Sequence, residues 1–85
     1  MKEAYEVRQV EAWNGPEGWT WNQSWKIGVM TTGAQNVRKA FTAYLRRKGI
    51  TFKTNRTRIE YDGDVYEIQD RKTGEPLFAA LPVSQ

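Results

Sequence analysis

One segment of this chain has the repeat of an amphipathic helix, and it lies between two regions that are patterned for β-strands. Apolar side chains at positions 34, 37, 41, 44 and 45 fall on one helical stripe. Thr32 and Gln35 have the spacing of a capping box, and three basic residues followed by Gly49 are typical of a helix end. We therefore predict one helix at about residues 33–48.

Period-two alternation predicts strands before this helix. It is clearest over residues 19–30, where large apolar side chains occupy odd positions and polar side chains occupy most even ones. A strand is also predicted at 4–13, with a bulge near Gln9 because its apolar residues change phase there. The segment between them, 14–18, is rich in glycine and proline and is expected to turn.

Turn signals divide the region after the helix into further strands. Asp62-Gly63 is a strong hairpin signal, and residues 54–56 hold either a bulge or a turn. Pro76 and Pro82 bracket the last strand, which favours a position at the edge of the sheet. The predicted strands are 50–61, 65–68 and 77–81.

These elements define an α+β fold. A single helix between two runs of antiparallel strands packs on one face of their sheet. We predict one domain over residues 1–85, with about five strands in the order β-β-α-β-β-β.

The residue types that most enzymes and metal sites use are missing from this chain. It has no cysteine and no histidine, so disulfides, thiolate ligands and imidazole bases are excluded. The densest carboxylate group comprises Asp62, Asp64, Glu67 and Asp70. Two of these acids flank a hairpin tip, where carboxylates are normally exposed, and their spacing does not match a calcium loop. We therefore expect no enzyme activity, no cofactor and no metal site.

Charge is distributed unevenly along the sequence. The net charge is +3, yet residues 18–59 contain nine lysines and arginines and no acid, while both flanking segments are acidic. Such a block predicts a surface that contacts phosphates, unless the acidic flanks pack beside it and neutralise it. The candidate nucleic-acid-binding residues are Arg46, Arg47, Lys48, Lys53, Arg56 and Arg58.

Four tryptophans allow two interpretations. Trp19, Trp21 and Trp25 share one predicted strand face, which either stacks unpaired bases or forms the core; we favour the core. Trp25 is expected to be deeply buried against the helix. Trp13 and Trp19 flank the turn at 14–18 and are expected to be more exposed, which makes them the candidate aromatic contacts.

Two segments resemble proteins from mobile genetic elements. Residues 19–25 (WTWNQSW) and 66–78 (YEIQDRKTGEPLF) are similar to small proteins without an assigned activity that are carried on conjugative elements of Gram-positive bacteria. The resemblance covers most of the chain. It implies a setting in which accessory proteins handle DNA or modulate DNA-handling enzymes, and it assigns a role to no residue.

Two functions follow as expectations. The first is a small accessory domain that binds nucleic acid without sequence specificity or in single-stranded form. The second is a protein-interaction module, such as a regulator of a larger enzyme, that does not contact nucleic acid. The chain has no signal-peptide pattern and no apolar run of spanning length, so a cytoplasmic protein without membrane contact is expected. If Glu60, Glu67 and Asp70 interleave with the bases, the second function gains.

Overall fold

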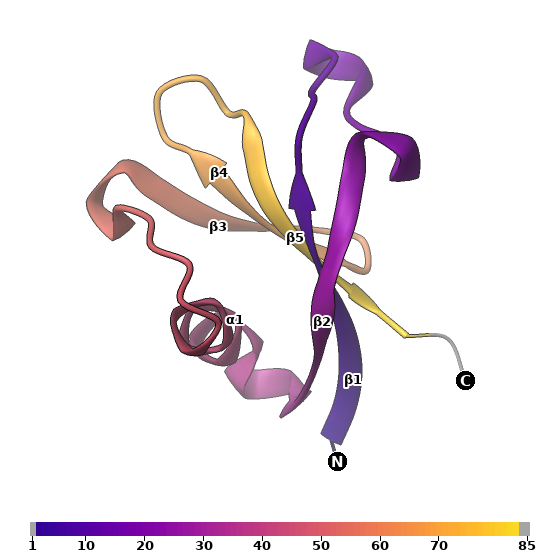
Figure 1. Ribbon diagram of the computed structural model, residues 1–85, viewed down its shortest axis with the longest axis vertical. Helices are drawn as coiled ribbons and strands as arrows, with labels where there is room; N and C mark the ends of the chain where they lie inside the picture. Colours follow the sequence, from indigo (N-terminus) through magenta and orange to yellow (C-terminus); the bar gives the residue numbers. More distant parts are fainter. Residues whose placement is uncertain (1, 84–85) are drawn as a thin grey trace.

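The computed structural model describes residues 2–83 and confirms the α+β class and the element order (Figure 1). Within these residues five strands and one helix are joined by turns, four of which are 3-10 turns. The main elements are β1 (Lys2–Val10), β2 (Ser24–Gly33), α1 (Val37–Arg47), β3 (Thr57–Asp62), β4 (Val65–Asp70) and β5 (Pro76–Pro82).

All neighbouring strands of the sheet are antiparallel, in the order β2-β1-β5-β4-β3. The last strand therefore lies at the centre of the sheet, and the edge position predicted from Pro76 and Pro82 is wrong. These prolines are the first and last residues of β5. At a strand end the missing N–H of proline removes little from the hydrogen-bond ladder, so proline is tolerated at the two ends of a central strand.

The helix covers one face of this sheet and supplies the apolar stripe that the sequence predicts (Figure 1). Ala34 is exposed and lies in a 3-10 turn before the helix, but the other stripe residues are buried. The core cluster consists of Val37, Phe41, Tyr44 and Leu45 from α1 with Tyr5, Val7, Met30, Ile68, Phe78 and Ala80 from the sheet.

The capping box predicted from Thr32 and Gln35 does not form, whereas the predicted end of the helix is confirmed. Thr32 belongs to β2, pairs with Glu3 and uses its hydroxyl to donate to the Gly33 carbonyl at 3.2 Å. Because the strand continues through Gly33, no capping box forms, and the helix begins at Val37 after a 3-10 turn. At the other end Gly49 has φ 77°, and the Ile50 amide donates to the Leu45 carbonyl at 3.0 Å, as in a Schellman motif.

The segment that contains Trp19 and Trp21 is a loop, so the predicted strand over 19–30 begins only at Ser24. The Gln23 side-chain oxygen accepts a hydrogen bond from the Thr20 amide at 2.8 Å and closes a 3-10 turn. The Gln23 carbonyl accepts one from the Glu11 amide at 2.7 Å, which closes the base of the loop. These contacts hold residues 11–23 together without a partner strand.

Two other irregularities occur where the sequence changes phase. The register between β1 and β2 shifts between Val7 and Arg8, which pair with Gly28 and Lys26, so the extra residue is Ile27 in β2 rather than one near Gln9. Residues 54–56 form a 3-10 turn, and the strand predicted to start at residue 50 begins at Thr57. Of the two alternatives for 54–56, the turn is therefore confirmed.

Ionisation of the buried Tyr5 is expected to lower the stability of the fold at alkaline pH. Burial, and then a hydrogen bond from its hydroxyl to Glu3 at 3.1 Å, raise the pKa of Tyr5 from 10.0 to about 12. Since the unfolded chain loses this proton at lower pH than the folded one, the stability from this group is complete below pH 10 and is lost as the pH rises to 12. At about pH 11 the loss is expected to be about 1.4 kcal/mol.

Urea unfolding of the wild type and of Tyr5→Phe, each at about pH 9 and about pH 11, measures this loss. The variant lacks the titrating phenol but keeps the ring, so its stability should fall less over the same interval. Equal falls for the two proteins would contradict a raised pKa of Tyr5.

Candidate functional site: two surfaces of opposite charge

The β3–β4 hairpin brings together two basic segments that are separated in the sequence. Thr57 pairs with Asp70, and one step further the Arg71 amide donates to the Arg56 carbonyl at 2.9 Å. The side chain of Arg71 also donates to the Thr57 carbonyl at 2.8 Å, which fixes the approach of the two segments. A hollow of about 440 Å³ lies here, lined by Asn55, Arg56, Asp70, Arg71 and Lys72.

Most bases of the predicted site have no acidic partner. Among residues 2–83, ion pairs within 4.0 Å involve only the bases Arg8, Lys26 and Arg58. Two cations at the helix end instead lie over the Tyr44 ring, Arg47 at 5.9 Å and Lys48 at 5.4 Å from its centroid. We call the three bases that line the hollow, Arg56, Arg71 and Lys72, the basic cluster; the other predicted bases Arg46, Arg47, Lys48 and Lys53 do not line it.

Arg58, which the sequence predicts to project together with Arg56, does not line the hollow that Arg56 lines. Arg58 lies on the side of β3 that points away from the helix, where its Nε is 3.2 Å from Glu60 and 3.3 Å from the Gln69 side-chain oxygen. Arg56 lies in the 3-10 turn before the strand, so strand alternation does not apply to it. Of the six predicted residues, only Arg56 lines the hollow, and only Arg58 is paired with an acid within residues 2–83.

Acids interleave with the bases in part. Glu60 pairs with Arg58, and Asp70 lines the hollow beside Arg56. The amides of Thr73 and Lys72 donate to the Asp70 carboxylate at 3.0 and 2.8 Å and lower the pKa of Asp70, so this acid is ionised and holds the turn. Glu67, in contrast, does not line this hollow and instead accepts a hydrogen bond from Trp19 in the loop of residues 11–23, here called the tryptophan loop.

The tryptophans are not arranged as predicted. Trp25 is 47% exposed and Trp21 is 54% exposed, whereas Trp13 and Trp19 are half-buried, which reverses the predicted order. β2 is an edge strand, and its contact with the helix end falls at Gly28, beside Tyr44 and Lys48. Trp25 lies beyond that contact, so the helix does not cover it. The prediction of a buried Trp25 is therefore wrong.

The tryptophan loop folds over the sheet face that lies away from the helix. The indole N–H of Trp19 donates to Glu67 in β4 at 2.9 Å, and the Arg8 guanidinium lies 4.3 Å from the centroid of the Trp21 ring. The two indoles meet edge to face, 6.5 Å apart at 74°. They bound a hollow of about 310 Å³, here called the tryptophan pocket, lined by Glu17, Gly18, Trp19, Thr20, Trp21, Asp62, Val65, Glu67 and Leu81.

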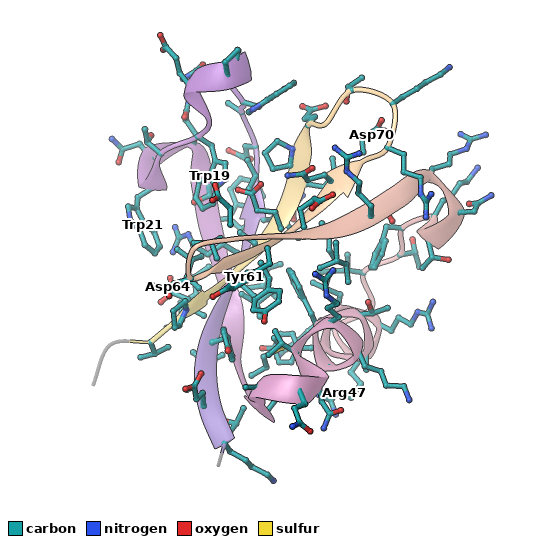
Figure 2. All side chains as sticks on the ribbon, turned by 180° about the vertical axis from the view of Figure 1, so that it is seen from behind. Trp19, Trp21, Arg47, Tyr61, Asp64 and Asp70 are labelled. Atoms are coloured by element: carbon teal, nitrogen blue, oxygen red, sulfur yellow. The ribbon has the colours of Figure 1, made fainter. Side chains whose placement is uncertain are left out.

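The two surfaces lie on different sides of the molecule. Figure 2 shows Trp19 and Trp21 at one side and Asp70, beside the basic cluster, at the other. The predicted carboxylate group is divided between them, since Asp62 and Glu67 line the tryptophan pocket and Asp70 does not. Within residues 2–83 no three carboxylates converge on a position that would hold a metal ion.

Comparison with protein-family models, with curated proteins and with solved structures finds no match to this chain. No helix between residues 2 and 83 is long and apolar enough to cross a membrane.

Proposed function

We propose that this chain binds the phosphate backbone of a nucleic acid through the basic cluster, without sequence specificity or in single-stranded form. The observation that carries this proposal is the junction of Arg56 with Arg71 and Lys72 around one hollow, with no ion pair to a carboxylate of residues 2–83. Unpaired guanidinium and ammonium groups bind phosphate oxygens and release the counterions condensed on them.

Base stacking by Trp19 is not part of this contact. Its indole N–H is bonded to Glu67, and the pocket that it lines also contains Glu17 and Asp62. Carboxylates at that position repel a phosphate chain, so a strand that follows the basic cluster is kept away from the tryptophans. We therefore propose a backbone contact rather than a stacking platform.

Arg56 and Lys72 provide the test because both are exposed and neither side chain makes a hydrogen bond or ion pair within residues 2–83. Binding of a fluorescent single-stranded oligonucleotide is measured by anisotropy between about 50 and about 200 mM salt. The double variant Arg56→Ala/Lys72→Ala should bind more weakly, and the slope of log K against log salt should become shallower by about 1.4, or about 0.7 for each lost phosphate contact.

Lys26→Ala/Arg58→Ala is the matched control, since it also removes two positive charges, but from bases that pair with Glu6 and Glu60. Its slope should match that of the wild type. Asp70→Asn keeps an oxygen for the turn and removes a negative charge, so it should tighten binding. Absence of wild-type binding at about 50 mM salt, or an equal loss in the control, would contradict the proposal.

One observation favours the alternative function, a protein-interaction module. β2 is an edge strand of the sheet, and it exposes Trp25 (47%) and Val29 (44%). An open strand edge with large apolar side chains can pair with an extended segment of another protein. If oligonucleotides do not bind, a partner whose binding is lost on Trp25→Ala would support this second function.

A further inference from the structure

The tryptophan pocket is a built hollow, since its walls are held by contacts between distant segments. One oxygen of the Glu67 carboxylate accepts a hydrogen bond from the Trp19 indole at 2.9 Å, and the other accepts one from the side-chain amide of Gln69 at 3.0 Å. Val65 and Leu81 lie on the same sheet face and give the pocket an apolar floor. The pocket therefore combines aromatic walls, an apolar floor and an oriented carboxylate.

Charge in this pocket has one sign. Three carboxylates, those of Glu17, Asp62 and Glu67, are among its lining residues, and no lysine or arginine is. The nearby base Arg8 does not line the pocket, because its guanidinium is bonded to Glu6 at 2.7 Å and to Ser24 at 2.8 Å. A positively charged group is thus the complementary occupant.

The chain itself provides an example of this recognition. Arg8 is stacked on Trp21 at 4.3 Å from the ring centroid, within the range of a cation–π contact. Trp21 is 54% exposed, so part of its surface is available to a second group. Indole faces bind weakly hydrated organic cations better than strongly hydrated metal ions, and an alkylammonium group gains both the ring contact and the carboxylates.

We propose that the tryptophan pocket binds an alkylammonium group, supplied by a lysine side chain of a partner protein and held best when that lysine is methylated. A side chain reaching in from a partner suits a pocket whose wall is exposed to solvent. The proposal is independent of nucleic-acid binding, because the pocket and the basic cluster share no residue.

The probe is a short glycine peptide with one trimethyllysine, and its control is the same peptide with the neutral isostere in which carbon replaces the charged nitrogen. Titrations are followed by the indole N–H signals in ¹H–¹⁵N NMR spectra. The cationic peptide should shift the signals of Trp19 and Trp21 and leave that of Trp25 unchanged. Its affinity should exceed that of the neutral peptide by about two- to fivefold.

Matched variants locate the site. Glu67→Gln removes the charge but keeps an oxygen for the Trp19 indole, and Asp62→Asn removes an exposed charge at the rim; each should weaken binding by about two- to fivefold. Asp64→Asn is the control, since Asp64 belongs to the same hairpin but does not line the pocket. Trp21→Leu should weaken binding, whereas Trp25→Leu, at a similarly exposed tryptophan, should not.

Three results would overturn this proposal. Equal binding of the neutral isostere would show that charge is not recognised. Equal weakening by Asp64→Asn would show that long-range attraction, rather than the pocket, holds the peptide. Shifts of the Trp19 and Trp21 signals by an oligonucleotide, with none by the peptide, would assign the pocket to base stacking instead.

Discussion

Replacing Phe41 by alanine is expected to lower the free energy of unfolding by about 3–5 kcal/mol. Phe41 has no exposed surface and lies in the middle of the α1 stripe, in a core cluster shared with Ile68 and Phe78. Truncation leaves a cavity in a thin core, and a domain of this size has a total stability of only about 5–15 kcal/mol. Thermal and urea unfolding followed by circular dichroism measure the loss.

Trp25→Ala is the matched comparison, since it truncates a larger aromatic side chain outside the core. Because Trp25 is 47% exposed on an edge strand, we expect this variant to lose only about 0.5–1 kcal/mol. The sequence pattern predicts the opposite, with Trp25 at the centre of the core. A loss at Trp25 as large as that at Phe41 would therefore contradict the packing described above.

The helix and the hairpins were predictable because short-range signals determine them. The stripe ending at Leu45 faces the sheet, and Gly49 terminates the helix with positive φ. Asp62-Gly63 likewise places a turn between β3 and β4, with Gly63 at φ 65°. In each case the residues that determine the local structure lie close together in the sequence.

The tryptophan loop could not be predicted in this way. Alternation over 19–23 is compatible with a strand, but Gln23 closes the loop on Thr20, and Trp19 finds its partner Glu67 at a separation of 48 residues. Thr32 is similar, because pairing with Glu3 extends β2 over the position predicted to cap the helix. Tertiary pairing decided both segments, and no local motif contains that information.

The basic cluster was predicted in part. Arg71 and Lys72 do not stand out in the sequence because they belong to an acidic stretch, where their charges are outnumbered. The hairpin turn does contain the missing signal: a loop of residues 63–64 pairs Asp62 with Val65 and therefore brings Arg56 next to Arg71. Counting charges across paired strands, rather than along the chain, would have identified the cluster.

Close packing against the helix explains why a glycine, Gly28, occupies a central position of β2. It pairs with Val7 on the face that carries the helix, and a Cβ built there would lie 2.0 Å from the Tyr44 hydroxyl oxygen and 3.3 Å from the adjacent ring carbon. Its φ is not positive, so backbone conformation does not require glycine. The requirement is space, since the buried Tyr44 ring lies directly over the strand.

Gly28→Ala should therefore destabilise the fold by about 1–3 kcal/mol through overpacking. Tyr44→Phe removes the atom that the new methyl group meets first, so Gly28→Ala should cost much less in that background. The four proteins of this double-mutant cycle are compared by urea unfolding, with the coupling free energy as the readout. The same cost in both backgrounds would show that the Tyr44 hydroxyl does not limit the position. A large coupling free energy would show that the Tyr44 hydroxyl leaves no room for a methyl group at position 28, so that the contact between helix and sheet requires glycine there.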